Sequence, residues 1–98
     1  MAFDITIFPE ALEHLLSFPV YYRRIVHQAI EQQLTHNPTE ETLHKKQMEP
    51  NELARWELRV RDYRVFYDVI ESESRVLVVA VGKKEHDRLV IGGKEVNP

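Results

Sequence analysis

The chain has 98 residues, 43% hydrophobic and 30% charged, with a formal net charge of −3, a balance typical of one soluble domain, which we expect over residues 1–98. It shows neither a signal peptide nor an apolar run near the roughly 20 residues of a membrane span, so we expect a cytoplasmic protein that does not enter a membrane. The absence of cysteine excludes disulfides, thiolate metal sites and cysteine nucleophiles, and the negative net charge counts mildly against nucleic-acid binding.

The first part of the chain predicts one strand and two helices. Residues 3–8 alternate apolar and polar side chains, as a half-buried strand does. A short helix is expected over residues 9–16, because proline suits its first turn and apolar residues follow at helical spacing. Ser17-Phe18-Pro19 interrupts this helix. A longer helical stripe covers residues 22–34 until Asn37-Pro38 ends it, and we expect the two helices to form an antiparallel hairpin.

A β-hairpin is predicted from the alternation that begins at Ala54. The polar connection before it, residues 37–53, is compatible with a helical turn over residues 39–46. A tight turn at Arg61-Asp62 places the apolar residues of both strands, Ala54 included, on one face, and a shift of one residue would reverse this. The turn pairs Val60 with Tyr63, Leu58 with Val65 and Trp56 with Tyr67, and on the polar face Arg59 with Arg64, Glu57 with Phe66 and Arg55 with Asp68.

The end of the chain predicts one more strand and a tail. The continuous apolar run Val76–Val81 indicates a central strand covered on both faces, which Gly82 closes. Residues 83–98 are expected as a variable C-terminal tail, polar apart from Leu89-Val90-Ile91 and with a turn at Gly92-Gly93. The order predicts an α+β fold with an N-terminal strand, a two-helix hairpin and a three-stranded antiparallel meander.

The hairpin also carries motifs that indicate a family. Leu58-Arg59, a short turn, Tyr63-Arg64 and Tyr67 follow one another, and the next strand ends in Gly82-Lys83-Lys84. With the helical hairpin before them, these motifs resemble the RelE/ParE superfamily of bacterial toxins over residues 3 to 88. The resemblance implies a toxin of a toxin–antitoxin pair, with a cognate antitoxin as partner. RelE-like members cleave mRNA on the ribosome, whereas ParE-like members poison DNA gyrase.

A nuclease of this kind must deprotonate a 2′-hydroxyl, stabilise charge on the phosphate and protonate the leaving 5′-oxygen. The resemblance implies that Arg64 is the phosphate-binding arginine, and that Lys84 holds the basic position after the glycine. Arg55 stands where RelE carries a lysine. Cross-strand Arg59 and Arg64 would repel each other unless an anion or a carboxylate lies between them, which favours a site here. The expected phosphate-binding residues beside Arg64 and Lys84 are Arg55, Arg59, Arg61 and Lys83.

The sequence departs from the RelE pattern at two catalytic positions. Glu57 replaces a lysine, and Val90 replaces the C-terminal tyrosine, with no tyrosine anywhere after Tyr67. In that region His86 is the residue whose type suits proton transfer near neutral pH. Glu57 or the loop residue Glu49 would then be the second acid–base group. The expected catalytic residues are therefore Arg64, Lys84, His86 and Glu57. Each also has a structural interpretation: Glu57 as partner of an arginine, and the others as solvated side chains.

No cofactor and no metal site are expected. The four histidines outside the tail lack the spacing of metal ligands and are interpreted as surface residues, namely His14, His27, His36 and His44. On the polar face Phe66, Leu77 and Val79 form an apolar strip that needs a cover. The tail folding back is one cover, and an antitoxin segment or a second copy of the chain is another.

These observations support two functional hypotheses, and a third remains open. The first is a ribosome-dependent mRNA endoribonuclease that inhibits translation, with the ribosome and mRNA as partners. The alternative is a non-catalytic binding protein of the same fold, either a degenerate toxin or a ParE-like gyrase inhibitor. The missing tyrosine, Glu57 and the acidic balance favour this alternative. A small interaction module unrelated to toxins is the third.

Overall fold

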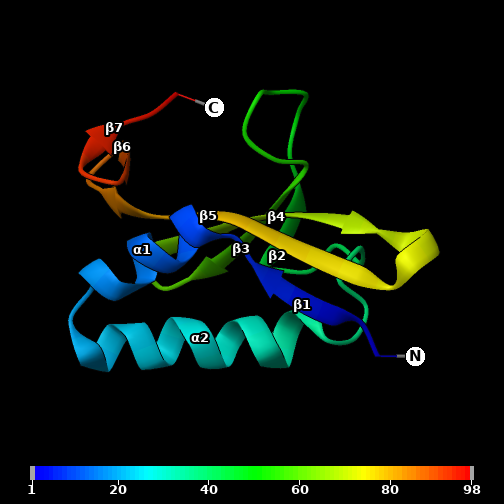
Figure 1. The fold of residues 1–98 in the computed structure, drawn as a ribbon. Coiled ribbons are helices and arrows are strands. Elements are labelled where there is room, and N and C mark those ends of the chain that lie inside the picture. The colour runs from blue at the N-terminus through cyan, green and yellow to red at the C-terminus, as the bar shows by residue number, and fades with distance from the viewer. Residues whose placement is uncertain (1, 98) are drawn as a thin grey trace.

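The computed structural model describes residues 2–97 and places two helices against one face of a sheet (Figure 1). Strand β1 (Asp4–Ile7) leads into helix α1 (Pro9–Ser17), and helix α2 (Val20–Leu34) follows directly. The sheet contains β2 (Lys45–Gln47), β3 (Trp56–Val60), β4 (Tyr63–Ile70), β5 (Arg75–Glu85), β6 (Arg88–Ile91) and β7 (Lys94–Glu95), with a 3₁₀ turn, η1 (Glu71–Glu73), between β4 and β5.

The predicted α+β fold is confirmed, with a wider sheet than expected. Strands β2 to β7 pair in chain order and antiparallel, while β1 runs parallel to β5. No helix among residues 2–97 is long and apolar enough to cross a bilayer. Because β5, the longest strand, pairs with both β1 and β6, it connects the two ends of the chain within one sheet.

The helices bury the apolar stripe that their sequence predicts. In α2 the buried residues are Val26, Ile30 and Leu34, which recur every fourth position and so face the sheet together. In α1, Ala11 and Leu15 do the same. The expected apolar stripe of α2 is not buried at its first residue, since Tyr22 remains 38% exposed.

The hairpin of β3 and β4 has the register that the alternation predicts. Val60 pairs with Tyr63, Leu58 with Val65, Trp56 with Tyr67 and Arg59 with Arg64. The turn contains no glycine, and Arg61 adopts the left-handed conformation instead, with φ of 56°. As predicted, three aromatic residues of the hairpin belong to the core beneath the helices, namely Trp56, Tyr63 and Tyr67.

The connection after α2 was expected to allow a helical turn over residues 39–46, and this is wrong. Residues 45–47 form β2 instead, because their backbone groups find partners along β3. Two buried side chains hold the connection in place. Lys45 Nζ donates to the carbonyls of Gln33 (3.2 Å) and Asn37 (2.9 Å), and the Tyr67 hydroxyl donates to Pro38 O (2.7 Å). Burial raises the pKa of Tyr67, so the hydroxyl keeps its proton and remains a donor.

Gly82 does not close the last predicted strand, because β5 continues through it to Glu85. A Cβ at this position would lie 2.7 Å from Ile91 Cγ1 and 2.8 Å from Val90 O, so only glycine lets β6 lie this close. The residues expected as a tail form β6 and β7. The predicted turn between them is confirmed, with φ of 59° at Gly92 and 80° at Gly93.

Strand β5 is covered on both faces, as predicted, and a bulge explains its lack of alternation. The register with β4 shifts between Phe66 and Tyr67, which leaves Val79 as an extra residue. Val78 and Val81 therefore both reach the core beneath the helices. In a regular strand, residues three positions apart would point to opposite faces. Ala80 lies in a second core on the opposite face.

The second core contains Phe66 and Val79 of the predicted apolar strip, whereas Leu77 is half-buried outside it. Leu89 and Ile91 of β6 belong to the same cluster, so the chain's own tail covers this part of the strip. Ala54 also belongs to this cluster, and its expected place on the other face is wrong. The reason is local: Ala54 precedes β3, and the Asn51 side chain accepts its backbone N–H at 3.1 Å.

His14 was interpreted as a surface residue, but it is half-buried and closes a gap in the sheet. On the same side of β5, β1 pairs with residues 75–78 and β6 with residues 83–85. Between these two stretches, the backbone N–H of Val81 donates to His14 Nδ1 at 3.2 Å. A helical side chain thus satisfies a strand donor that lacks a neighbouring strand.

We predict that Lys45→Met destabilises the protein by about 1–3 kcal/mol, because the carbonyl of Gln33 in α2 and that of Asn37 just after it lose their buried donor. The measurement is the free energy of unfolding in urea. The matched control is Lys46→Met, which removes an exposed ammonium group from the same strand and should change stability by less than about 0.5 kcal/mol. Equal losses in the two variants would contradict the role of Lys45.

Gly82→Ala should separate β6 from β5, because the added methyl group would meet the backbone of Val90. The expected loss is about 1–3 kcal/mol, typical of overpacking in a close contact. Compared with the wild type, the variant should show faster hydrogen exchange of the amides in β6, whereas exchange in β3 should change less. Lys84→Ala, two residues along the same strand, serves as control. Unchanged protection of β6 would show that the backbone accommodates the methyl group.

Candidate functional site

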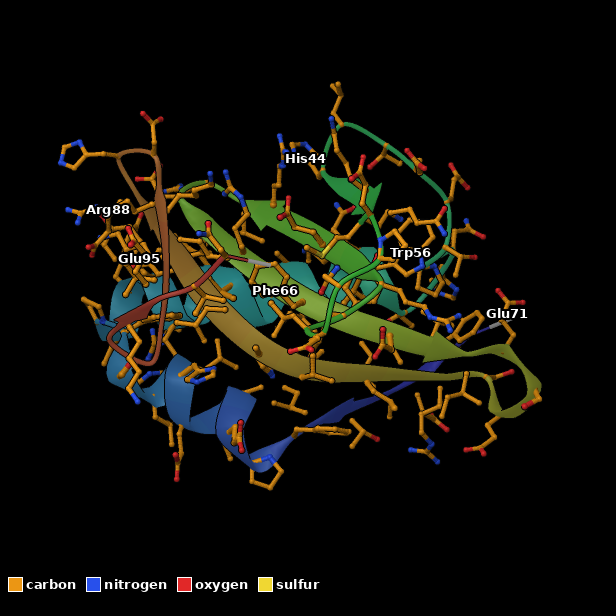
Figure 2. All side chains as sticks on the ribbon, turned by 90° about the horizontal axis from the view of Figure 1, so that it is seen from above. His44, Trp56, Phe66, Glu71, Arg88 and Glu95 are labelled. Carbon is orange, nitrogen blue, oxygen red and sulfur yellow. The ribbon has the colours of Figure 1, made fainter. Side chains whose placement is uncertain are left out.

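The sheet face opposite the helices carries charged residues beside its second apolar core. Figure 2 looks onto this face, with His44 at one edge, Arg88 and Glu95 toward the other, and Phe66 between them. Near the β3–β4 turn, three strands contribute to one group, which we call the charged cluster: Glu57 and Arg59 from β3, Arg64 from β4 and Lys84 from β5.

A carboxylate holds the two arginines of the charged cluster together. Arg59 and Arg64 are directly paired across the strands, where like charges repel. Glu57 Oε1 lies 2.9 Å from Arg59 Nε and 4.0 Å from Arg64 Nε. The anion expected between the arginines is therefore supplied by the chain itself.

Arg64 is the more fixed of the two arginines. Its side chain is 15% exposed, and its Nη1 donates to the carbonyls of Arg61 (2.8 Å) and Tyr63 (2.9 Å). Burial lowers the pKa of Arg64, the charge of Glu57 opposes this, and Arg59 adds to it. A guanidinium group nevertheless stays protonated in proteins, so Arg64 is a preorganised cation.

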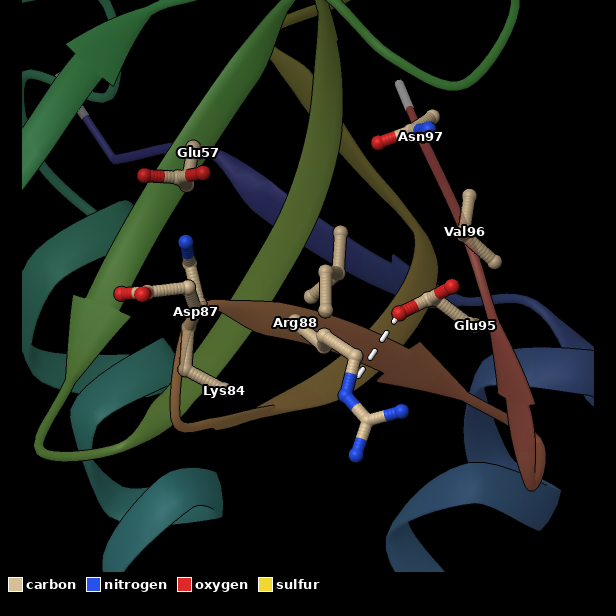
Figure 3. A pocket seen from close by; sticks show the side chains of 8 residues that line it. Glu57, Lys84, Asp87, Arg88, Glu95, Val96 and Asn97 are labelled. Carbon is tan, nitrogen blue, oxygen red and sulfur yellow. Dashed lines mark ion pairs between the residues drawn. The ribbon is translucent and has the colours of Figure 1, made fainter.

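A pocket of about 240 Å³ adjoins the charged cluster (Figure 3). Glu57 and Lys84 line it on the sheet side. Two further lining residues, Arg88 and Glu95, form an ion pair (Figure 3), with Nε and Oε1 3.6 Å apart. The remaining walls come from the end of the chain, namely Asp87, Leu89, Val96 and Asn97.

Of the eight expected site residues, only Glu57 and Lys84 line this pocket, and Arg59 and Arg64 adjoin it through Glu57. His86 occupies the turn between β5 and β6, where it is exposed and has φ of 57°. Lys83 points to the helix side, with Nζ 5.8 Å from the Tyr63 ring centroid, and Arg61 lies 6.0 Å from the ring of Tyr21. The structure thus gathers four of the eight expected residues.

Arg55 lies toward the far end of β3. Its backbone N–H, rather than its guanidinium group, meets Asp68, donating to Oδ1 at 2.8 Å. The exposed side chain lines a separate hollow formed with residues 47–51, among them Glu49. Glu49, the alternative partner for His86, is therefore not one of the residues that line the pocket of Glu57.

The sequence matches the family model described as ParE toxin of type II toxin–antitoxin system, parDE, over residues 5–88. The chain belongs to this toxin family. The resemblance to the RelE/ParE superfamily is thereby confirmed. No curated protein matches the sequence.

Solved structures share the toxin's fold at low sequence identity. The RelBE2 toxin–antitoxin complex of Mycobacterium tuberculosis matches with a TM-score of 0.75 and 15% identity, over 86% of this chain and 93% of that one. The RelE–RelB complex of Pyrococcus horikoshii OT3 gives 0.70 and 18%, over 88% and 99%. The isolated RelE toxin of E. coli gives 0.68 and 22%, over 88% of each chain.

Sequence reasoning missed the contribution of β2 to the toxin's charged face. Lys46 pairs directly with Glu57, and His44 O accepts the N–H of Arg59 at 2.7 Å. A polar strand of three residues has no periodicity to detect, so no pattern indicated it. Among residues 2–97, no three carboxylate or imidazole side chains come together in a way that would hold a metal ion.

We predict that Glu57→Gln turns the toxin's two arginines into an anion site. Phosphate at about five times its dissociation constant should then stabilise the variant by about 1 kcal/mol. For a protein of this size that raises the Tm by roughly 4–8 °C. The comparison is with sodium chloride at equal ionic strength.

The wild type should gain less from phosphate, because Glu57 already lies between the arginines. The control adds Arg64→Ala to Glu57→Gln and should lose the gain. A wild type that responds as strongly as Glu57→Gln would argue against this role of Glu57.

Proposed function

We propose that this toxin is an endoribonuclease that cleaves mRNA on the translating ribosome and so inhibits translation. The observation that carries the proposal is the charged cluster, in which Glu57 lies beside Arg59 and Arg64 and shares a pocket with Lys84. Cleavage of a phosphodiester needs a base, fixed cations and a proton donor around one phosphate. The resemblance of the hairpin motifs to RelE supports mRNA on the ribosome as the substrate.

The reaction is an internal transfer at phosphorus. A bound phosphate takes the place of the Glu57 carboxylate at the arginines, which frees Glu57 to accept the proton of the 2′-hydroxyl. The 2′-oxygen forms a bond to phosphorus, while Arg59 and Arg64 stabilise the charge on the phosphoryl oxygens. The bond to the 5′-oxygen breaks, and this oxygen takes a proton from the Lys84 ammonium group. The products are a 2′,3′-cyclic phosphate and a 5′-hydroxyl.

His86 is the second candidate for the proton donor. It lies two residues beyond Lys84 but is not among the residues that line the pocket, so Lys84 is the better-placed group. Arg55, Arg61 and Lys83 lie outside the pocket, and we assign them to phosphates on either side of the cleaved bond.

We propose that a cognate antitoxin encoded beside the toxin neutralises it in the cytoplasm. The family description names a two-component system, and two of the similar solved structures are described as complexes of RelE-type toxins with RelB-type partners. The antitoxin would keep the enzyme inactive until it is degraded or titrated away.

A second candidate function is inhibition of DNA gyrase by binding alone. The family model is that of ParE, and the sequence has no tyrosine after Tyr67. Glu57 also satisfies the arginines in the free protein, as a purely structural ion pair would. In this case the charged cluster holds the hairpin and contacts the partner without a chemical step.

Primer extension on mRNA in a translating cell-free extract separates the two candidates. We expect discrete cleavages that need ribosomes, and a loss of about 100-fold or more in Arg64→Ala, because a fixed donor to the phosphoryl oxygens is removed. Arg24→Ala, which removes an exposed arginine on α2, is the matched control and should cleave like wild type. Folded wild-type protein that leaves mRNA intact but blocks gyrase supercoiling would establish the second candidate instead.

A further inference from the structure

A row of aromatic rings lies on the helix side of the sheet, near the turn between β3 and β4. Phe18 and Tyr63 are 4.6 Å apart between ring centroids, Tyr22 and Tyr63 are 5.7 Å apart, and Tyr21 and Tyr22 are 5.1 Å apart at 80°. The row begins in the core, where Tyr63 is 4% exposed, and ends at Tyr21, which is 62% exposed. Half of the row is therefore packing, and the other half is surface.

Two cations accompany these rings. The guanidinium carbon of Arg61 lies 6.0 Å from the Tyr21 centroid, and Lys83 Nζ lies 5.8 Å from that of Tyr63. Both distances are within the range of cation–π attraction. The same turn also contains one acidic residue, Asp62, which is exposed. The surface at Tyr21 thus combines an open ring with positive charge.

An exposed tyrosine by itself needs no explanation, and packing accounts for Tyr63 and Phe18. The combination is more specific. Proteins that bind single-stranded nucleic acid stack bases on aromatic rings and meet the phosphates with Arg or Lys beside them. Tyr21 and Tyr22 meet edge to face and are 62% and 38% exposed, so neither ring is covered by the other.

We propose that Tyr21, Tyr22, Arg61 and Lys83 form a binding platform for unpaired bases of single-stranded RNA. The platform lies around the end of the sheet from the pocket. Lys83 and Lys84 are consecutive and serve the two sides: Lys83 lies over Tyr63, and Lys84 lines the pocket with Glu57. An RNA strand that leaves the pocket past the β3–β4 turn reaches the platform. The choice of RNA rests on the proposed function, but binding here needs no cleavage.

The test is the affinity of the full chain for a labelled, unstructured RNA of about ten nucleotides, measured by fluorescence anisotropy without ribosomes. Tyr21→Ala should weaken binding about 5-fold to 100-fold, the effect of losing one stacked base. Tyr21→Phe keeps the ring and should bind within about twofold of wild type. Leu12→Ala, which truncates another exposed apolar side chain on the helical hairpin, is the matched control.

Charge and strand state provide independent readouts. Arg61→Ala should reduce the slope of log affinity against log salt by about one, as the loss of one phosphate contact does. The same RNA annealed to its complement should bind more weakly, because its bases are no longer free to stack on tyrosine. A DNA oligonucleotide of the same sequence that binds equally would assign the platform to single strands of either kind and overturn the choice of RNA.

Equal affinity of wild type and Tyr21→Ala would overturn the platform. So would an equal loss in Tyr21→Ala and Leu12→Ala, because the loss of RNA affinity would then not depend on the aromatic ring. The result is separable from the proposed nuclease. Ring-dependent RNA binding without mRNA cleavage in extract would support the platform and sink the nuclease, and cleavage that survives Tyr21→Ala with unchanged RNA affinity would do the reverse.

Discussion

The pairing of β3 with β4 about the Arg61-Asp62 turn is the constraint on which both faces of the molecule depend. This register turns six apolar side chains toward the helices, and by the same alternation it turns Glu57, Arg59 and Arg64 to the other face. A shift of one residue would bury charges and expose the core, so the hydrophobic effect fixes the register strongly. The positions of the charged side chains are thus a consequence of core packing as much as of their own attractions.

The bulge in β5 extends this arrangement to a third strand. Because Val79 is an extra residue, the positions after it change faces relative to those before it. Lys84 therefore reaches the side of Glu57, while Lys83 lies over Tyr63 beneath the helices. Without the bulge the two lysines would exchange sides. One inserted residue in the centre of the sheet decides which ammonium group meets the pocket.

Local patterns were enough to predict the helices, the β3–β4 register and the place of three members of the charged cluster. They failed where long-range contacts decide the structure. The short polar strand at Lys45 exists only because β3 offers it an edge, and Gly82 is explained only by the approach of β6. His14 has a structural role that depends on a strand donor 67 positions away. The walls of the pocket contributed by Arg88 and Glu95 were beyond reach for the same reason, since nothing in a polar tail specifies where it folds back.

The ion pair of Glu57 with the two arginines has a consequence for selectivity. An incoming phosphate does not enter a vacant site but exchanges one anion for another, so it gains only the difference between the two. An oligonucleotide that contacts the protein through one phosphate gains too little free energy to displace the carboxylate. A substrate held at many points at once supplies the missing free energy from its other contacts. In the nuclease that we propose, an internal carboxylate of this kind would spare the bulk of cellular RNA and still allow cleavage of a strand bound at all its contacts.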